Sequence, residues 1–163
     1  ESKIPYGIGL VKNKYIGRTF ISPSQELREK SVKVKLNAIK KVVEGKRVVV
    51  IDDSLVRGTT SKKIVKMLRE AGAKEVHFRS ASPVVKNECY FGIDIATKKE
   101  LIGSKMTLEE IREKIDADSL DYLTLENLKL TLGGTNFCMG CFTGNYPITD
   151  MENKSLEDED ADL

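Results

Sequence analysis

Two adjacent carboxylates, and a glycine followed by hydroxyl side chains, are the residues of this chain best suited to chemistry. Asp52 and Asp53 precede a turn around Gly58, and residues 59–61 then read Thr-Thr-Ser, which predicts a helix capped by one of these hydroxyls. Carboxylates can hold Mg²⁺ beside phosphate oxygens, and they accept hydrogen bonds from sugar hydroxyls. A glycine turn that opens a helix offers free N–H groups at the positive end of the helix dipole, which favours an anion. Together these features predict a site for a sugar phosphate.

A strand must carry these residues to the edge of a sheet, and a helix must follow them. Residues 48–51 are Val or Ile without polar alternation, which is typical of a parallel strand covered on both faces. Apolar residues recur at helical spacing after the turn, at Ile64, Val65, Leu68 and Ala71. Gly72 stands where a helix C-cap belongs, and residues 75–80 read as a second strand. Residues 47–80 therefore form one right-handed βαβ unit, with the aspartates at the edge where open α/β sheets bind ligands.

The three cysteines are a second group that could do chemistry. Cys138 and Cys141 form a C-x-x-C pair, and Cys89 lies far upstream. In a cytosolic chain this pattern indicates metal binding or redox chemistry rather than a structural disulfide. Three thiols leave a tetrahedral site one ligand short, and the sole histidine, His77, falls within the predicted strand 75–80. The thiols alone leave a metal site, a redox pair and simple reduced cysteines open.

The run 48–61 resembles the signature of the type I phosphoribosyltransferases, in which aliphatic residues and two acids precede a phosphate loop ending in Gly-x-Thr. Other segments resemble one branch of these enzymes, the amidophosphoribosyltransferase family: residues 4–25, 45–47, 54–61, 91–94, 117–120 and 137–147. The resemblance extends from about residue 4 to residue 147. It implies an α/β fold with an open, mostly parallel sheet and flanking helices, incomplete at its N-terminal side.

The resemblance also implies a reaction. Enzymes of this family replace the pyrophosphate of phosphoribosylpyrophosphate (PRPP) with ammonia released from glutamine, giving phosphoribosylamine in the first committed step of purine synthesis. By resemblance, Asp52 and Asp53 hold the ribose hydroxyls and Mg²⁺. The 5′-phosphate would be bound by the loop residues Arg57, Gly58, Thr59 and Thr60.

A flexible loop that closes over PRPP is implied at about residues 18–36. Its candidate contacts to the departing pyrophosphate are Arg18 and Lys35. The spacing of apolar residues in and after this segment also fits an ordinary amphipathic helix with a solvent-facing lysine side, through Val32, Leu36, Ile39 and Val43. For any single lysine, the solvated helix face is the simpler interpretation.

The surroundings of the cysteines resemble those of the amidophosphoribosyltransferases that bind a 4Fe–4S cluster through four thiolates. Cys89, Cys138 and Cys141 would be three of the ligands, and the fourth, upstream in those enzymes, has no counterpart in this sequence. The family's N-terminal glutaminase domain has none either. We therefore expect a fragment that is inactive alone. A zinc-binding structural protein is disfavoured because the chain lacks a fourth ligand.

The expected parts are a C-terminal portion of the phosphoribosyltransferase domain (1–105), a helical segment with the C-x-x-C pair (106–150) and an acidic disordered tail (151–163). Thr107 and Glu110 have the spacing of a capping box, which predicts a helix to about Ile115. Residues 118–123 then read as a short strand, and residues 125–132 read as a final helix.

Composition limits the partners. Lys and Arg number 27 against 25 Asp and Glu, so charge gives no case for nucleic-acid or membrane binding. No apolar stretch has the length of a membrane span and no signal peptide opens the chain, so we expect a cytoplasmic protein. The resemblance implies PRPP, glutamine or ammonia and purine nucleotide inhibitors as ligands, and a homo-oligomer, commonly a tetramer. The alternative function is a PRPP-sensing regulator with the same fold that does no chemistry.

Overall fold

A three-stranded parallel sheet forms the centre of the protein in the computed structural model, which describes residues 3–12, 36–93, 98–134 and 137–147. Its strands lie in the order β3 (Arg47–Asp52), β4 (Glu75–Ser80) and β5 (Ser119–Tyr122). The register pairs Asp52 with Ser80 and Ser80 with Tyr122. A separate antiparallel pair joins β1 (Leu10–Lys12) to β2 (Leu36–Ala38).

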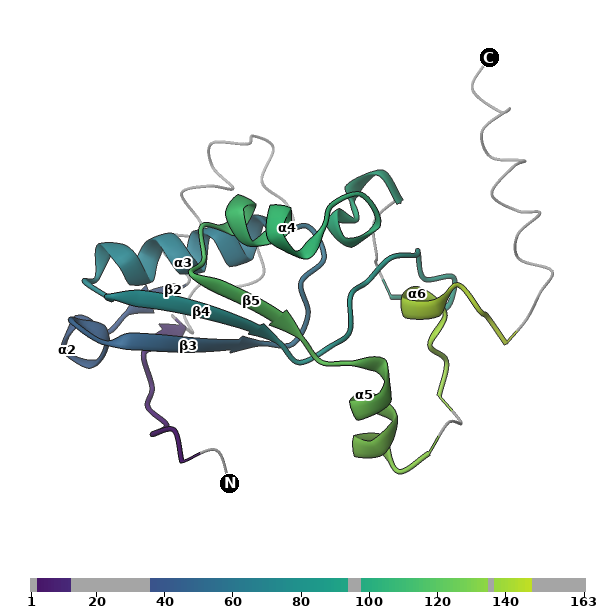
Figure 1. The fold of residues 1–163 in the computed structure, drawn as a ribbon, viewed down its shortest axis with the longest axis horizontal. Helices are drawn as coiled ribbons and strands as arrows, with labels where there is room; N and C mark the ends of the chain where they lie inside the picture. Colours follow the sequence, from purple (N-terminus) through teal and green to yellow (C-terminus); the bar gives the residue numbers. More distant parts are fainter. Residues whose placement is uncertain (1–2, 13–35, 94–97, 135–136, 148–163) are drawn as a thin grey trace, which may run out of the picture.

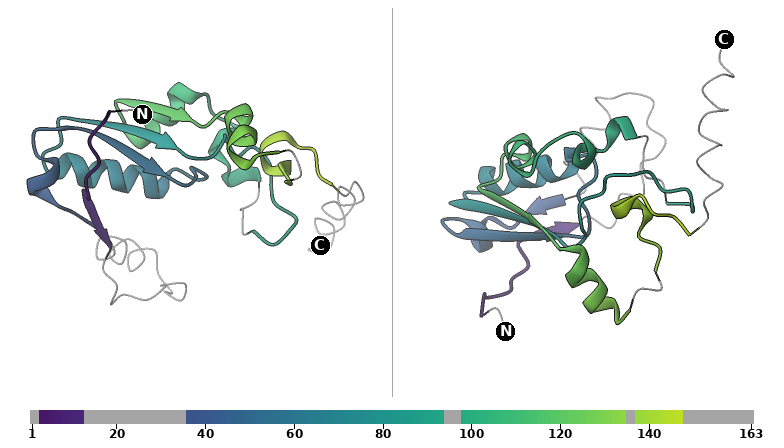
Figure 2. Two further views of the ribbon diagram at one scale, coloured as in Figure 1. Left: turned by 90° about the horizontal axis from the view of Figure 1, so that it is seen from below. Right: turned by 45° about the vertical axis from the view of Figure 1, so that its right-hand side comes forward.

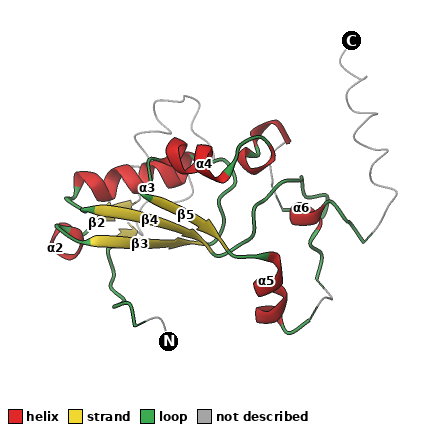
Figure 3. Cartoon of the chain, viewed as in Figure 1, coloured by secondary structure: helices red, strands yellow, loops and turns green. Residues whose placement is uncertain are grey.

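The helices occupy two places relative to the sheet. Helices α3 and α4 lie along one of its faces, whereas α5 and α6 lie beyond the carboxyl ends of its strands (Figures 1 and 2). The helices are α2 (Lys40–Val43), α3 (Thr59–Glu70), α4 (Leu108–Ile115), α5 (Leu125–Leu132) and α6 (Gly140–Thr143), with 3₁₀ turns η1 (Lys98–Glu100) and η2 (Ile102–Ser104) (Figure 3). Within the described ranges, no helix has the length and apolar character needed to cross a membrane.

The hydrophobic core lies between the sheet and helices α3 and α4. Alternate strand residues supply one side of it: Val50, Val76, Phe78 and Leu120. The two helices supply the other side: Ile64, Val65, Leu68, Ile111 and Ile115. Helix α4 and strand β5 follow the expected boundary at residue 105, yet they pack in the same core as β3 and α3. This core fixes the end of β3, where the candidate site begins.

The opposite face of β3 is open among the described residues. Val49 and Ile51 are 42 % and 74 % exposed. The prediction of a strand covered on both faces is therefore wrong for the part of the chain that the structure describes. Successive side chains of a strand point to opposite faces, and α3 and α4 both lie on the face that Val48 and Val50 share.

Most of the predicted elements are confirmed. The βαβ unit extends from Arg47 to Ser80, and Gly72 follows α3 with a φ of +92°. The capping box is present, because the Thr107 side chain accepts from the Glu110 N–H while the Glu110 carboxylate accepts from the Thr107 N–H. The alternative of one amphipathic helix from Val32 to Val43 is wrong over residues 36–38, which pair with β1 as strand β2.

Asp118 joins β5, β4 and α3 through one carboxylate oxygen. Its Oδ2 accepts from the Val76 backbone N–H at 2.6 Å and from Arg69 Nη2 at 3.1 Å. These bonds, first the one from Val76, lower the pKa of Asp118.

Replacing Asp118 with alanine should lower the free energy of unfolding by about 1–2 kcal/mol, because a strand N–H and a guanidinium lose their acceptor. Chemical denaturation of the full-length gene product at neutral pH checks this. The difference in stability should shrink as pH falls below about 4. A carboxylate whose pKa is lowered in the folded protein contributes its full stabilisation above its pKa in the unfolded chain, and it loses that stabilisation as pH falls through its pKa in the folded protein. Asp121→Ala is the control, since among the described residues its exposed carboxylate reaches only Arg79, at 3.4 Å. An equal loss in both variants would contradict the assignment.

Candidate functional site

The two carboxylates stand where β3 ends. Asp52 is the last residue of the strand, and its backbone carbonyl accepts from the Ala81 N–H at 2.8 Å, which extends the pairing with β4. The Asp53 N–H donates to Asp52 Oδ1 at 3.1 Å, and Ser54 Oγ donates to Asp53 Oδ1 at 3.0 Å. Asp52 is half-buried and Asp53 is exposed. Both carboxylates therefore lie at the carboxyl edge of the sheet, as predicted.

The environment of Asp52 suits a cation. Burial raises the pKa of Asp52, the hydrogen bond from the Asp53 N–H lowers it, and the negative charge of Asp53 raises it further. Two neighbouring carboxylates, one of them partly desolvated, favour a bound cation that compensates their charge. Mg²⁺ binds proteins through one or two carboxylates together with substrate phosphates, so these two residues fit that ion.

A loop of five residues links the carboxylates to helix α3. Leu55, only 2 % exposed, anchors this loop in the core. Gly58 is the N-cap of α3 and has a φ of +73°, a conformation that glycine adopts at little cost. A Cβ on Gly58 would lie 3.0 Å from Ile102 Cδ1 and 3.4 Å from Ile115 Cγ2. Both the backbone conformation and the close approach of neighbouring residues therefore require glycine here.

The start of α3 leaves donors for an anion. The Gly58 carbonyl accepts from the Lys62 N–H at 2.9 Å, so helical hydrogen bonding begins there and the N–H groups of residues 59–61 have no intrahelical acceptor. The expectation that a Thr or Ser hydroxyl caps the helix is wrong, because Gly58 takes the N-cap position without a side-chain bond. The side chains of Thr59 and Thr60 are exposed instead. The arrangement offers N–H groups and hydroxyls to one anion.

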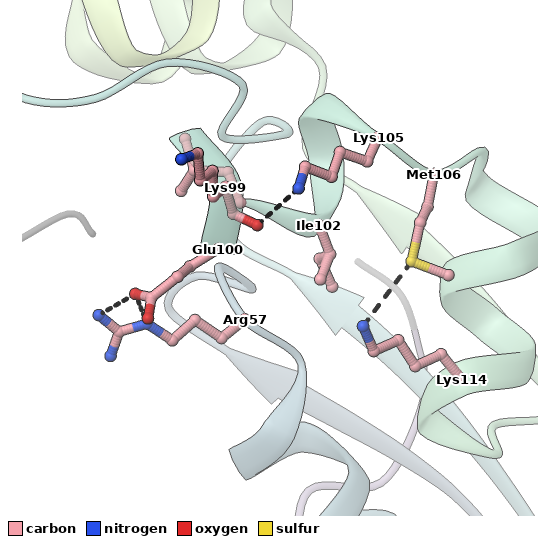
Figure 4. Close-up of a pocket in the computed structure, with 8 residues that line it drawn as sticks. Arg57, Lys99, Glu100, Ile102, Lys105, Met106 and Lys114 are labelled. Atoms are coloured by element: carbon pink, nitrogen blue, oxygen red, sulfur yellow. Dashed lines mark hydrogen bonds and ion pairs between the residues drawn. The ribbon is translucent and has the colours of Figure 1, made fainter. Parts of the chain in front are cut away.

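The Arg57 guanidinium pairs with a carboxylate from outside the motif. Its Nε and Nη2 both lie on Glu100 Oε2, at 2.9 and 2.8 Å (Figure 4). The ion pair borders a pocket of about 330 Å³ that Asp52, Asp53, Thr59 and Thr60 do not line. The pocket is lined by Arg57, Lys99, Glu100, Leu101, Ile102, Lys105, Met106 and Lys114. Sequence reasoning missed Glu100, since 43 positions separate it from Arg57 and no local spacing links the two.

The cysteine-bearing segments lie against each other. The Lys86 and Asn87 N–H groups both donate to the Cys141 carbonyl, at 2.9 and 3.0 Å. Tyr146 Oη donates to the Glu88 carbonyl at 2.6 Å, next to Cys89. Burial, followed by the charge of Cys89, raises the pKa of the Cys141 thiol.

No group of three or more His, Cys, Asp or Glu side chains in the described ranges is arranged to hold a metal ion. All three cysteines are free, with Cys138 exposed. His77 belongs to the sheet: its ring nitrogens contact Ser119 Oγ at 2.9 Å and Glu75 Oε2 at 3.0 Å. The candidate loop residues Arg18 and Lys35, like the acidic tail 151–163, lie outside the described residues.

Known proteins share this arrangement. Residues 4–102 match the family described as phosphoribosyl transferase domain. The chain belongs to that family. The predicted fold of the phosphoribosyl transferase domain, a parallel sheet flanked by helices, is thereby confirmed.

Relatives of this phosphoribosyl transferase domain are amidophosphoribosyltransferases. One from Methanocaldococcus jannaschii is 58 % identical over 147 residues, covering 90 % of this chain and 31 % of that protein. One from Bacillus subtilis is 55 % identical over 150 residues, covering 88 % of this chain and 32 % of that protein. A structure of the glutamine PRPP amidotransferase from B. subtilis, complexed with ADP and GMP, superimposes with a TM-score of 0.76 at 55 % identity. The match covers 88 % of this chain and 33 % of that structure's chain. The chain thus spans about a third of the length of the curated relatives it matches.

Proposed function

We propose that the full-length gene product is an amidophosphoribosyltransferase, a glycosyltransferase that makes phosphoribosylamine from PRPP and glutamine-derived ammonia. The observation that supports this proposal most is the site at the end of β3. Two carboxylates lie there near a helix that opens at a left-handed glycine and whose first N–H groups have no acceptor within the helix. Identity above 50 % to amidophosphoribosyltransferases supports the same assignment. The alternative of a non-catalytic regulator gains no support from these relatives, which are named as enzymes.

In this proposal the described residues bind and orient PRPP. Asp52 and Asp53 hold the ribose hydroxyls and would also hold Mg²⁺, which would supply charge neutralisation for the pyrophosphate. The N–H groups and hydroxyls of Thr59 and Thr60 bind the 5′-phosphate at the start of α3. Fixing both ends of the ribose presents its anomeric carbon to ammonia while pyrophosphate leaves, so positioning supplies much of the rate.

The test is pyrophosphate release by the purified full-length gene product. With Mg²⁺ and PRPP, we expect pyrophosphate release to require either ammonia or glutamine. When ammonia is the donor, one ammonia should be consumed for each pyrophosphate released. Tight PRPP binding without any release under both conditions would favour the regulator. If the protein neither binds PRPP nor releases pyrophosphate, the assignment of the site is refuted.

The remaining parts of the proposal follow the same relatives. Arg18 and Lys35 contact pyrophosphate from a loop at about residues 18–36. Residues 1–105 belong to the end of the catalytic domain, whose core continues through α4 and β5, and the cysteine-bearing segment lies within residues 106–150. Purine nucleotides inhibit the enzyme; the B. subtilis relative complexed with ADP and GMP supports nucleotide binding. The protein is a cytoplasmic homo-oligomer, commonly a tetramer in this family.

We further propose that Cys89, Cys138 and Cys141 ligate a 4Fe–4S cluster. The support is the contact between the segments that carry them, which joins residues 86–88 to Cys141 and Tyr146. The fit of the described residues is partial: they supply three thiols, such a cluster takes four, and the raised pKa of Cys141 disfavours the thiolate until a metal binds.

Anaerobically purified full-length gene product should contain about four iron and four sulfide ions per chain, the content of one such cluster. Cys89→Ser should lose most of that iron and become more sensitive to protease around residues 137–147, because metal ligation couples the two segments. Ser82→Ala, in the same connection after β4, is the control and should keep its iron. Zinc without sulfide in the wild type would exclude the cluster.

A further inference from the structure

We infer that Arg57 and Glu100 form a clamp that positions the 5′-phosphate loop, and that Arg57 acts through the loop backbone rather than as a ligand of the phosphate. The inference rests on the proposed function and deepens it, because it gives Arg57 a role different from the one that the motif alone implies. It also assigns a role to Glu100, which no motif identifies.

The ion pair connects two segments that are distant in sequence. Arg57 Nη2 and Nε approach one oxygen of Glu100, at 2.8 and 2.9 Å. Both side chains are about half exposed, at 50 % and 53 %. A pair this exposed contributes little to global stability. Its larger effect is therefore local, on the orientation of the loop that carries Arg57.

Backbone and packing contacts join the same two segments next to the ion pair. The Ile102 N–H donates to the Val56 carbonyl at 3.1 Å. Ile102 Cδ1 also lies 3.0 Å from where a Cβ of Gly58 would be. Residues 56, 57 and 58 therefore each meet the 98–104 segment, by a backbone bond, an ion pair and a side-chain contact respectively. These contacts hold the loop against the 98–104 segment, just before the N–H donors at the start of α3.

The Arg57 guanidinium lies at a pocket that the phosphate donors do not line. This pocket lies beside η1 and η2 (Figure 4), whereas the phosphate donors of the proposal are the N–H groups and hydroxyls of Thr59 and Thr60. Lys99, Lys105 and Lys114 also line this pocket, so Glu100 is its one carboxylate among the described lining residues. Without Glu100, Arg57 would share the pocket lining only with lysines among the charged described residues, and the loop would lose its ion pair with the 98–104 segment.

The experiment is a double-mutant cycle in the full-length gene product with Arg57→Ala, Glu100→Ala and the double variant. The readouts are KM for PRPP, KM for ammonia, kcat and Tm. A clamp predicts that each single variant raises KM for PRPP about three- to five-fold, with KM for ammonia and Tm nearly unchanged. The double variant should be no worse than either single variant, because the two residues act through one contact.

Glu109→Ala is the matched control, since Glu109 forms an ion pair with Arg112 at 2.6 Å on α4, away from the loop. It should leave KM for PRPP unchanged. A far larger loss in Arg57→Ala than in Glu100→Ala, of the order of tenfold or more, would identify Arg57 as a direct phosphate ligand and overturn the clamp. An unchanged KM for PRPP in Glu100→Ala would also overturn it. So would a double variant whose increase in KM equals the product of the two single-variant increases. A wild type without PRPP-dependent release would refute the proposed function itself, and the clamp with it.

Discussion

Replacing Asp52 and Asp53 together with asparagine should abolish phosphoribosylamine formation from PRPP, with ammonia and with glutamine alike. In the proposed function both routes use one sugar-phosphate site, where the two carboxylates at the end of β3 would hold Mg²⁺ and the ribose. Asparagine keeps the size of each side chain and one acceptor oxygen but removes the charge that binds the cation. We expect kcat/KM for PRPP to fall by at least about a thousandfold, as when charge stabilisation of a transition state is lost. Coupled detection of pyrophosphate measures it.

The control for this experiment is Asp121→Asn, an exposed aspartate in β5 of the same sheet. It should retain wild-type activity and the same Tm. Glutamine hydrolysis by the double variant should keep a basal rate, because that step does not use the ribose site. A double variant that keeps most of its ammonia-dependent rate would contradict the assignment of the carboxylates.

Gly58→Ala should raise KM for PRPP about tenfold or more and lower the free energy of unfolding by about 2 kcal/mol. A left-handed residue other than glycine costs roughly 1–2 kcal/mol, and here the new Cβ would also lie 3.0 Å from Ile102 Cδ1. Relieving the backbone strain would shift the start of α3, and with it the N–H groups that are proposed to bind the phosphate. Steady-state kinetics and chemical denaturation of the full-length gene product measure the two effects.

Gly45 offers a matched control for the backbone effect alone. It has a φ of +70°, and a Cβ there would meet no atom of the described residues within 4 Å. Gly45→Ala should therefore lose about 1 kcal/mol of stability and leave KM for PRPP unchanged. If Gly58→Ala behaved like Gly45→Ala in both measurements, the close approach of Ile102 would have no functional role.

The βαβ unit could be predicted from the sequence because each part has a local signal. A run of β-branched residues predicted β3, the helical spacing of apolar residues predicted α3, and a glycine predicted the end of α3. The predicted bounds of the unit agree with the structure from Arg47 to Ser80. The capping box at Thr107 and Glu110 is another local signal that held. Such features depend on neighbours in the chain, so one sequence suffices to find them.

Other features depend on contacts between distant residues, and sequence reasoning missed them or was wrong about them. The exposure of Ile51 depends on which face α3 and α4 cover. Strand β2 forms where an amphipathic helix also fitted, because β1 pairs with it. The role of Glu100 follows from an ion pair across 43 positions. The Gly58 N-cap replaced the expected hydroxyl cap because the loop needs a left-handed turn at that position.

The most direct test of the central claim is a crystal structure of the full-length gene product with Mg²⁺ and a non-hydrolysable PRPP analogue. We expect the ribose hydroxyls and Mg²⁺ at Asp52 and Asp53, and the 5′-phosphate on the N–H groups and hydroxyls of Thr59 and Thr60. Arg57 should remain on Glu100. An analogue bound away from the end of β3, or a phosphate held elsewhere with the start of α3 free, would contradict it.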